Sequence, residues 1–199
     1  MGGDDSFGLP SYNQAQYGQP PLEYHVYRDA SFFSKDDVVT GPDKQNVLYY
    51  LDFPRKFLSN SWDLTLKRGG PQGPQACQII KGHFGDSFNI TTHGQTRCQR
   101  VGFFRPRYQF GGNGNTELYE WRPDGHFIHQ KDYSLYKETE LNLPEAQRKV
   151  IAHWRTPWST FTKDGTLLIH PEHAYEQELI LATALGIEER ARERRERNR

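Results

Sequence analysis

Apolar and polar residues alternate in short runs along most of the chain between residues 22 and 170. In the segment 61–67, Trp62, Leu64 and Leu66 alternate with polar residues. A period of two places one face of a strand in a core and the other in water. Other runs, such as VLYYLDF at 47–53, are rich in aromatic and aliphatic residues that suit a pleated surface. We predict strands over 22–33, 47–53, 61–67, 75–84, 86–93, 97–104, 116–122 and near 150–154.

Turn-forming residues separate these runs. Gly41-Pro42-Asp43, Pro123-Asp124-Gly125 and Lys163-Asp164-Gly165 are predicted tight turns, because Gly, Pro and Asp adopt the backbone angles that such turns need. We count about ten short strands with turns between them. This spacing is typical of an antiparallel barrel or of a sandwich.

The C-terminal segment has a different pattern and predicts a helix over 172–197. Its middle, residues 179–187, is apolar on every side, and a helix of that kind must be buried all round. It is too short to cross a bilayer. In a chain of strands, the simplest enclosure is a closed barrel with the helix running through it. Residues 188–199 alternate acidic residues with Arg and are expected to continue as a solvated helix or to fray.

The first 21 residues are mostly Gly, Gln, Tyr and Pro and predict a disordered tail. The expected organisation is a tail over 1–21, a barrel with its central helix over 22–187, and a charged helical tail over 188–199. Met1-Gly2, followed by Ser6, fits the myristoylation pattern at Gly2. An unmodified flexible tail is the alternative, since Asp4 and Asp5 suit an acidic membrane poorly.

Composition narrows the functional classes. The 199 residues include 25 Lys and Arg and 25 Asp and Glu, so no global charge favours nucleic acid as a partner. The N-terminus has no apolar signal segment, which predicts an intracellular, cytoplasmic protein. In that compartment Cys77 and Cys98 are expected to be free thiols. Cys98 lies near two arginines, but a buried strand cysteine is the favoured interpretation.

We find no motif typical of a catalytic site. Nucleophile elbows, phosphate-binding glycine loops and the HExxH zinc motif are absent from the sequence. The pairs His126/His129 and His170/His173 have no Cys partner at zinc-site spacing, so we interpret them as scattered surface histidines. The expectation is a non-catalytic protein without a cofactor or a metal ion.

Basic residues beside aromatic ones are the candidate binding sites. Arg55 and Lys56 lie between two Phe-containing pairs, Lys67 and Arg68 end the Trp62 strand, and Arg105 and Arg107 follow Phe103-Phe104. Cations flanked by rings suit anionic lipid headgroups at a membrane interface. The alternative is ordinary solvated loop charge, which the neutral net charge favours.

The order of several features resembles the tubby C-terminal-like superfamily, which includes the LURP-one-related proteins and the phospholipid scramblases. The resemblance is greatest to uncharacterised fungal tubby-like proteins and spans about residues 22–197. It depends on the run from Tyr27-Arg28 to Phe33, the Trp62-to-Leu66 strand, Tyr119-Glu120-Trp121-Arg122, Ala152, Asp164-Gly165-Thr166-Leu167 and the terminal apolar helix. It implies a twelve-stranded barrel around a central helix and binding to phosphoinositides or a membrane surface. None of the superfamily's lipid-contacting residues is placed on this sequence.

These observations predict a mainly β fold, a closed antiparallel barrel of about twelve strands threaded by a hydrophobic C-terminal helix. The expected function is a membrane-surface adaptor that binds anionic, phosphoinositide-type headgroups, with Arg55, Lys56, Lys67, Arg68, Arg105 and Arg107 as candidate residues. The alternative is an intracellular protein-interaction domain without a lipid role. We expect a monomer, at the membrane periphery if it binds lipid, with no nucleic acid partner.

Overall fold

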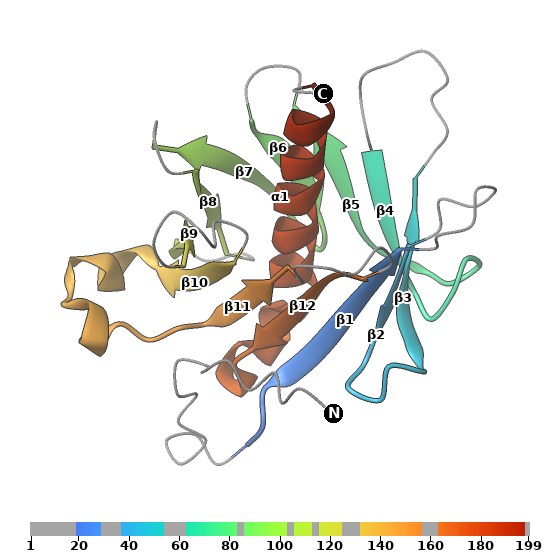
Figure 1. Cartoon of the computed structure of the whole chain (residues 1–199), viewed down its shortest axis with the longest axis horizontal. Coiled ribbons are helices and arrows are strands. Elements are labelled where there is room, and N and C mark those ends of the chain that lie inside the picture. Colours follow the sequence, from blue (N-terminus) through green and yellow to red (C-terminus); the bar gives the residue numbers. More distant parts are fainter. Residues whose placement is uncertain are drawn as a thin grey trace, which may run out of the picture.

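Twelve strands and a long C-terminal helix make up a computed structural model of the chain (Figure 1). It describes residues 19–28, 37–53, 63–82, 86–102, 106–112, 116–124, 132–156 and 163–197. The strands are β1 (Leu22–Arg28), β2 (Asp37–Thr40), β3 (Val47–Asp52), β4 (Asp63–Arg68), β5 (Gln75–Lys81), β6 (Phe88–Thr91), β7 (Gln95–Val101), β8 (Arg107–Gly111), β9 (Leu118–Pro123), β10 (Tyr133–Lys137), β11 (Ala152–Arg155) and β12 (Lys163–Ile169). Within the described residues, the 3₁₀ segments η2 (Glu138–Asn142), η3 (Glu145–Gln147) and η4 (Pro171–Glu176) precede α1 (Gln177–Arg197).

The strands form one closed antiparallel barrel. Each strand pairs with its neighbour in sequence, and β1 pairs with β12 to close the ring, with Leu22 opposite Ile169. The barrel prediction is confirmed, and the sandwich alternative is excluded. Closure leaves no unpaired strand edge, which removes a common route to aggregation.

Helix α1 runs through the middle of the barrel, as Figure 1 shows. The side chains of Leu179 to Ala182 are at most 1% exposed, and those of Ala184, Leu185 and Ile187 are at most 6% exposed. Because successive residues of a helix point in different directions, burial of the whole run requires protein on every side. The prediction of an enclosed C-terminal helix is confirmed.

The inward-facing residues of the strands supply the other half of the core. In β4, Leu64 and Leu66 are 0% exposed while their neighbours are half-buried, which is the alternation that the sequence predicted. Trp121 of β9 also points inward, and its Nε1 donates to the Thr183 hydroxyl of α1 at 2.9 Å. The barrel wall therefore contacts the helix through both apolar packing and buried hydrogen bonds.

Two glycines permit unusually close packing. A Cβ atom on Gly165 would lie 2.3 Å from Cζ2 of Trp154, and a Cβ on Gly186 would lie 2.4 Å from Cε2 of Phe88. The predicted turn at Lys163-Asp164-Gly165 is wrong, because these residues begin β12. Because Gly165 has no side chain, the ring of Trp154 on the neighbouring strand can pack against its backbone. Glycine in a strand often marks a site where another group packs this closely.

The prediction for the end of the chain is partly wrong. Residues 188–197 continue as helix, and Arg195 and Arg197 are exposed, as expected for a solvated helix. Arg190, however, is 1% exposed. The predicted disordered tail over 1–21 lies outside the described residues as far as residue 18, and so does Gly2.

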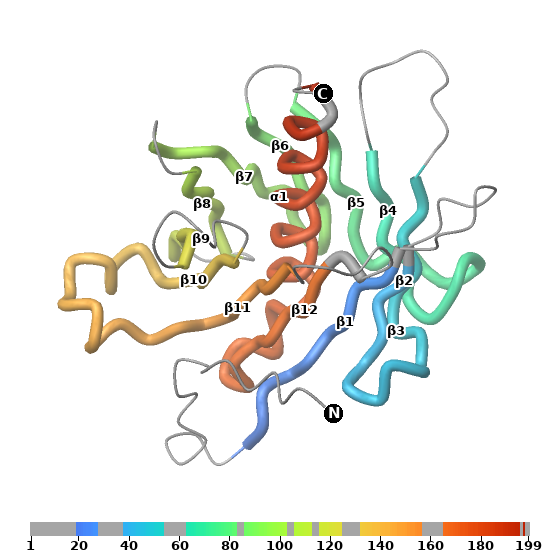
Figure 2. Tube along the Cα trace, viewed as in Figure 1, coloured from blue at the N-terminus to red at the C-terminus, as the bar shows by residue number. Residues whose placement is uncertain are grey.

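We call the end of the barrel where α1 begins the entry end and the end where α1 finishes the exit end. In the tube view of Figure 2, α1 leads up from η4. At the entry end α1 begins, and the connections there span 41–46, 69–74, 92–94, 112–117, 138–151 and 170–176. At the exit end α1 ends, beside the strand ends Lys81, Phe88, Val101 and Arg107. The connection between β10 and β11 projects from the side of the barrel (Figure 2).

Candidate functional site

Inward-pointing tyrosines hold the start of α1 at the entry end. The Tyr24 hydroxyl donates to Oε1 of Gln177 at 2.5 Å, and the Tyr119 hydroxyl lies 2.6 Å from Oε2 of Glu176. Glu176 is 1% exposed, and a carboxylate so deeply buried needs hydrogen-bond donors. Burial, with a further contribution from the charge of Glu178, raises the pKa of Tyr24 to about 12. Its hydroxyl therefore keeps the hydrogen that it donates.

Arg68 ends β4 and binds α1 through one edge of its guanidinium group. Its Nε and Nη2 each donate to an oxygen of Glu178 at 2.7 Å, and the Tyr49 hydroxyl donates to the same carboxylate at 3.3 Å. Paired, charge-assisted hydrogen bonds of this kind fix both distance and orientation. One of the predicted lipid-binding residues thus positions the first turn of the central helix.

Arg190 occupies the corresponding place at the exit end. Its Nη2 donates to the carbonyl oxygens of Ser87 at 2.5 Å and Gly82 at 3.2 Å. Its Nη1 lies 3.0 Å from Oε2 of Glu193, one turn later on α1. A guanidinium group with several donors suits a site with more than one backbone carbonyl acceptor. Arg190 therefore ties α1 to the connection between β5 and β6.

Two acidic residues complete the exit end. Oδ2 of Asp86 accepts from Arg100 of β7 at 2.7 Å and from Arg194 of α1 at 3.0 Å. Burial alone would raise the pKa of Asp86, but the two arginines outweigh it and hold that pKa below its usual value. Glu193 is bonded by Lys81 of β5 at 2.5 Å. The polar end of α1 is thereby fixed to the barrel rim.

The sequence interpretation missed these exit-end contacts, although a signal for them exists. Thr183, Ile187, Arg190 and Arg194 are spaced by four, three and four residues, so they continue one face of the helix. A buried face that ends in arginines predicts carbonyl or carboxylate partners at the barrel rim.

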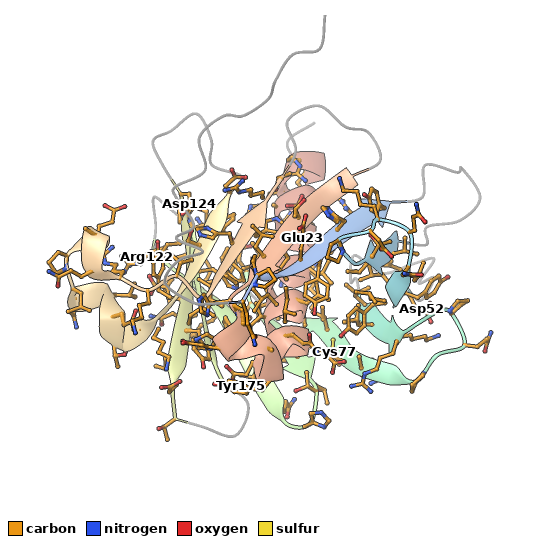
Figure 3. All side chains as sticks on the ribbon, turned by 90° about the horizontal axis from the view of Figure 1, so that it is seen from below. Glu23, Asp52, Cys77, Arg122, Asp124 and Tyr175 are labelled. Atoms are coloured by element: carbon orange, nitrogen blue, oxygen red, sulfur yellow. The ribbon has the colours of Figure 1, made fainter. Side chains whose placement is uncertain are left out.

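The candidate basic residues do not form one cluster. Lys67 is the residue before the last of β4, which ends at the entry end. Its Nζ pairs with Asp52, the last residue of β3, at 2.7 Å and donates to the Pro71 carbonyl at 3.1 Å. Arg107 starts β8 at the exit end and pairs with Glu120 at 3.3 Å. Figure 3 shows Asp52 far across the molecule from Arg122, which shares Glu120 with Arg107. Lys67 and Arg107 therefore belong to separate surfaces.

Glu120 organises the surface around Arg107. Its side chain is 2% exposed and accepts from Arg122 at 2.6 Å, from Gln109 at 2.8 Å and from Arg107 at 3.3 Å. Two guanidinium groups on one carboxylate leave an excess of positive charge there. Arg122 was not among the predicted binding residues, because it is a single cation, with no second Lys or Arg close to it in the sequence.

Arg55, Lys56, Arg105 and Gly2 lie outside the described residues. The described residues nearest to these three cations in the sequence adjoin the exit end. Phe53 follows the last residue of β3, and Gly102 and Pro106 stand between β7 and β8.

The structure also tests the sequence predictions for the cysteines and the histidines. Cys77 and Cys98 are both 0% exposed and unpaired as thiols, which confirms the prediction of a buried strand cysteine. Burial, and to a lesser degree Glu178, raises the pKa of Cys77 to about 12. The prediction of surface histidines is wrong for His170, which is 5% exposed. His126 and His129 lie outside the described residues.

A serine, a histidine and an aspartate meet on the outside of β9, β10 and β11. The Ser134 hydroxyl lies 2.7 Å from Oδ2 of Asp124 and 2.8 Å from Nδ1 of His153, and that nitrogen is 3.8 Å from Asp124. In a hydrolytic triad the serine and the acid contact different ring nitrogens. Here both meet Nδ1, so the arrangement is a hydrogen-bonded cross-strand contact. Figure 3 shows Asp124 near Arg122 on this side.

No protein-family model matches the chain, and no curated protein matches it either. The resemblance to tubby-like proteins stays a prediction, although the barrel and central helix are the architecture that it implied. Among the described residues, no group of three or more His, Cys, Asp and Glu is placed to hold a metal ion. Within the same residues, no helix combines the length and apolar character needed to span a bilayer.

Proposed function

We propose that this protein binds the surface of anionic membranes through the exit end of its barrel. The supporting observation is the sequence of the segments that join strands at that end: 29–36, 54–62, 83–85, 103–105, 125–131 and 157–162. The chain has 12 Phe and 4 Trp, and most of them fall in these six segments. They are Phe32, Phe33, Phe57, Trp62, Phe84, Phe103, Phe104, Phe127, Trp158 and Phe161.

The charges in the same segments suit an anionic surface. The cations are Lys35, Arg55, Lys56, Arg105 and Lys131, and the acids are Asp29 and Asp36. Aromatic and apolar side chains bind at the level of the lipid headgroups, and each nearby Lys or Arg adds about 1 kcal/mol on an anionic membrane. The exposed Arg195 and Arg197 of α1 lie toward the same end.

The entry end has the opposite composition. Its six connections contain no Phe or Trp, and their acids outnumber their cations. Arg68, the strongest basic candidate there, is bound to Glu178. Lys67 and Arg68 are therefore not part of the proposed surface, whereas Arg55, Lys56, Arg105 and Arg107 are.

Sedimentation with vesicles tests this proposal. The protein is mixed with neutral vesicles or with vesicles that contain a phosphoinositide, at low and at physiological salt. Binding should require the anionic lipid and weaken with salt, because exposed charges are screened. The double variant Lys56→Gln, Arg105→Gln removes two cations from the exit end. At about 1 kcal/mol each, its partition coefficient should fall by about 30-fold.

The matched control is Lys44→Gln with Lys67→Gln, which removes two cations near the entry end and should leave binding within about twofold. Equal losses in the two double variants would contradict the exit-end assignment. Absence of vesicle binding at low salt, for protein with and without an N-terminal acyl chain, would favour the protein-interaction alternative.

A further inference from the structure

A small polar cleft lies at the entry end, beside the start of η4. It encloses about 110 Å³ and is lined by Lys137, Glu140, Lys149, Val150, Ile151, His170, Glu172 and His173. That volume admits one small polyatomic ion or a few waters. None of its lining residues belongs to the proposed membrane surface.

Backbone hydrogen bonds fix the walls of this cleft. Ile151 N donates to the Leu135 carbonyl at 2.8 Å, and His170 N donates to the Ile151 carbonyl at 2.8 Å. Lys149 N donates to Oε2 of Glu140 at 2.8 Å. The segment before β11, η2 and the start of η4 are therefore held together before any ligand binds, which lowers the entropic cost of binding.

The cleft offers positive charge and hydrogen-bond donors. Lys149 forms no ion pair within the described part of the chain, and the carboxylates of Glu140 and Glu172 line the same cleft. Lys137 is 2.9 Å from Oε1 of Glu117. Burial lowers the pKa of His170; the charge of Glu172 opposes this shift, and that of Lys149 adds to it. Burial likewise lowers the pKa of His173, with Lys137 next in effect. Both shifts favour the neutral form of these rings, which line the cleft together with the two lysines.

The cleft also offers hydrogen-bond acceptors. Glu140 and Glu172 line it with carboxylates. The Nδ1 atom of His173 is buried and has no hydrogen-bond partner among the described residues. The ring of His173 lies between Tyr119, in edge contact at 6.3 Å, and Tyr175, stacked at 6.1 Å. A ligand that accepts from lysine and also donates to a carboxylate or imidazole nitrogen matches this lining.

We propose that the cleft binds a protonated phosphate group, such as hydrogen phosphate, through Lys137, Lys149 and His173 with Glu172 as the acceptor of its O–H. At neutral pH inorganic phosphate keeps at least one O–H, while sulfate keeps none. A carboxylate facing sulfate would have no hydrogen to accept and would repel the anion. The mixed lining therefore selects phosphate over sulfate.

Isothermal titration calorimetry with inorganic phosphate and with sulfate, at matched ionic strength and pH 7, tests the proposal. Phosphate should bind at least about tenfold more tightly than sulfate, and Lys149→Ala should weaken phosphate binding by at least about tenfold. Glu172→Gln should reduce the preference for phosphate. The matched controls are Lys44→Asn, another entry-end cation, and Glu138→Gln, an exposed acid of η2 that does not line the cleft; both should bind as the unaltered protein does.

Vesicles containing phosphatidic acid identify the source of the phosphate. If Lys149→Ala loses vesicle binding as well as phosphate binding, the group belongs to a lipid headgroup. If it loses only phosphate binding, the ligand is a free phosphate. The Lys56→Gln, Arg105→Gln variant should bind phosphate normally, whatever it does on vesicles. Equal affinity of the unaltered protein for phosphate and sulfate, or binding unaffected by Lys149→Ala, would overturn the proposal.

Discussion

Single residues decide how closely the wall and the helix of this barrel pack. Gly165 faces the ring of Trp154, and Gly186 faces the ring of Phe88, in both cases at distances that exclude a Cβ atom. Sequence reasoning interpreted the glycine at 165 as a turn signal. The turn preference of Asp-Gly is local, whereas the requirement for space comes from a residue on a neighbouring strand.

We expect Gly165→Ala to destabilise the protein by about 1–3 kcal/mol, the usual cost of overpacking a core. Chemical denaturation measures the free energy of unfolding. Gly70→Ala is the control, because a Cβ on Gly70 meets nothing within 4 Å, and its effect should be small. An equal loss in both variants would show that glycine is not needed beside Trp154.

The two histidines of the entry cleft make stability depend on pH. Their pKa values are lowered in the folded state, so below about 6.5 the unfolded chain binds more protons than the folded one. The free energy of unfolding should therefore fall as the pH drops from 7 through the histidine range. The double variant His170→Asn, His173→Asn should show a flatter pH profile over that range, whatever stability it loses at pH 8. An unchanged slope, measured by denaturation in phosphate-free buffer, would contradict the assignment.

At the scale of elements, α1 is fixed at both ends by charged and polar side chains of the barrel. Glu178 is held at the entry end by Arg68, and Arg190 and Arg194 are bound at the exit end. The apolar run 179–187 predicted the enclosed helix, because burial all round has few alternatives. The anchoring arginines were not predicted, since a mixed Arg and Glu sequence is equally typical of a solvated helix.

Truncation separates the buried and the solvated parts of this helix. A chain that ends at Glu189 loses Arg190, Glu193 and Arg194, and leaves Lys81 and Asp86 without those helix partners. We expect a loss of about 3 kcal/mol or more in the free energy of unfolding. A chain that ends at Arg195 keeps these contacts and should melt within a few degrees of the full protein. Similar stability of the two truncated proteins would contradict the anchoring.

Some strands, such as β4, were predicted from the sequence, whereas others, such as β2 and β10, were not. β4 has one buried and one half-exposed face, so apolar and polar residues alternate along it and predict a strand. β2 is only four residues long, too short for a period to emerge. In β10, Tyr133, Ser134 and Leu135 are all buried, so no alternation marks it. The order of strands in a closed barrel follows from sequence adjacency once the closing pair of β1 and β12 is known.

At the scale of the whole molecule, the two ends of the barrel differ in composition and, we propose, in function. The exit end joins its strands through segments rich in Phe, Trp and cations, and the entry end through segments without Phe or Trp. The sequence alone grouped Lys67 and Arg68 with Arg105 and Arg107, because sequence separation does not show at which end of the barrel a residue lies. The strand directions separate them.

Quenching of tryptophan fluorescence by brominated lipids tests the proposed orientation most directly. Trp121 and Trp154 are at most 2% exposed inside the barrel, whereas Trp62 and Trp158 belong to the segments at the exit end. On anionic vesicles with brominated acyl chains we expect the fluorescence of the full protein to be quenched. The variant Trp62→Phe, Trp158→Phe should still sediment with the vesicles but show almost no quenching. Membrane-bound protein with no quenching, or with quenching that persists in this variant, would contradict binding through the exit end.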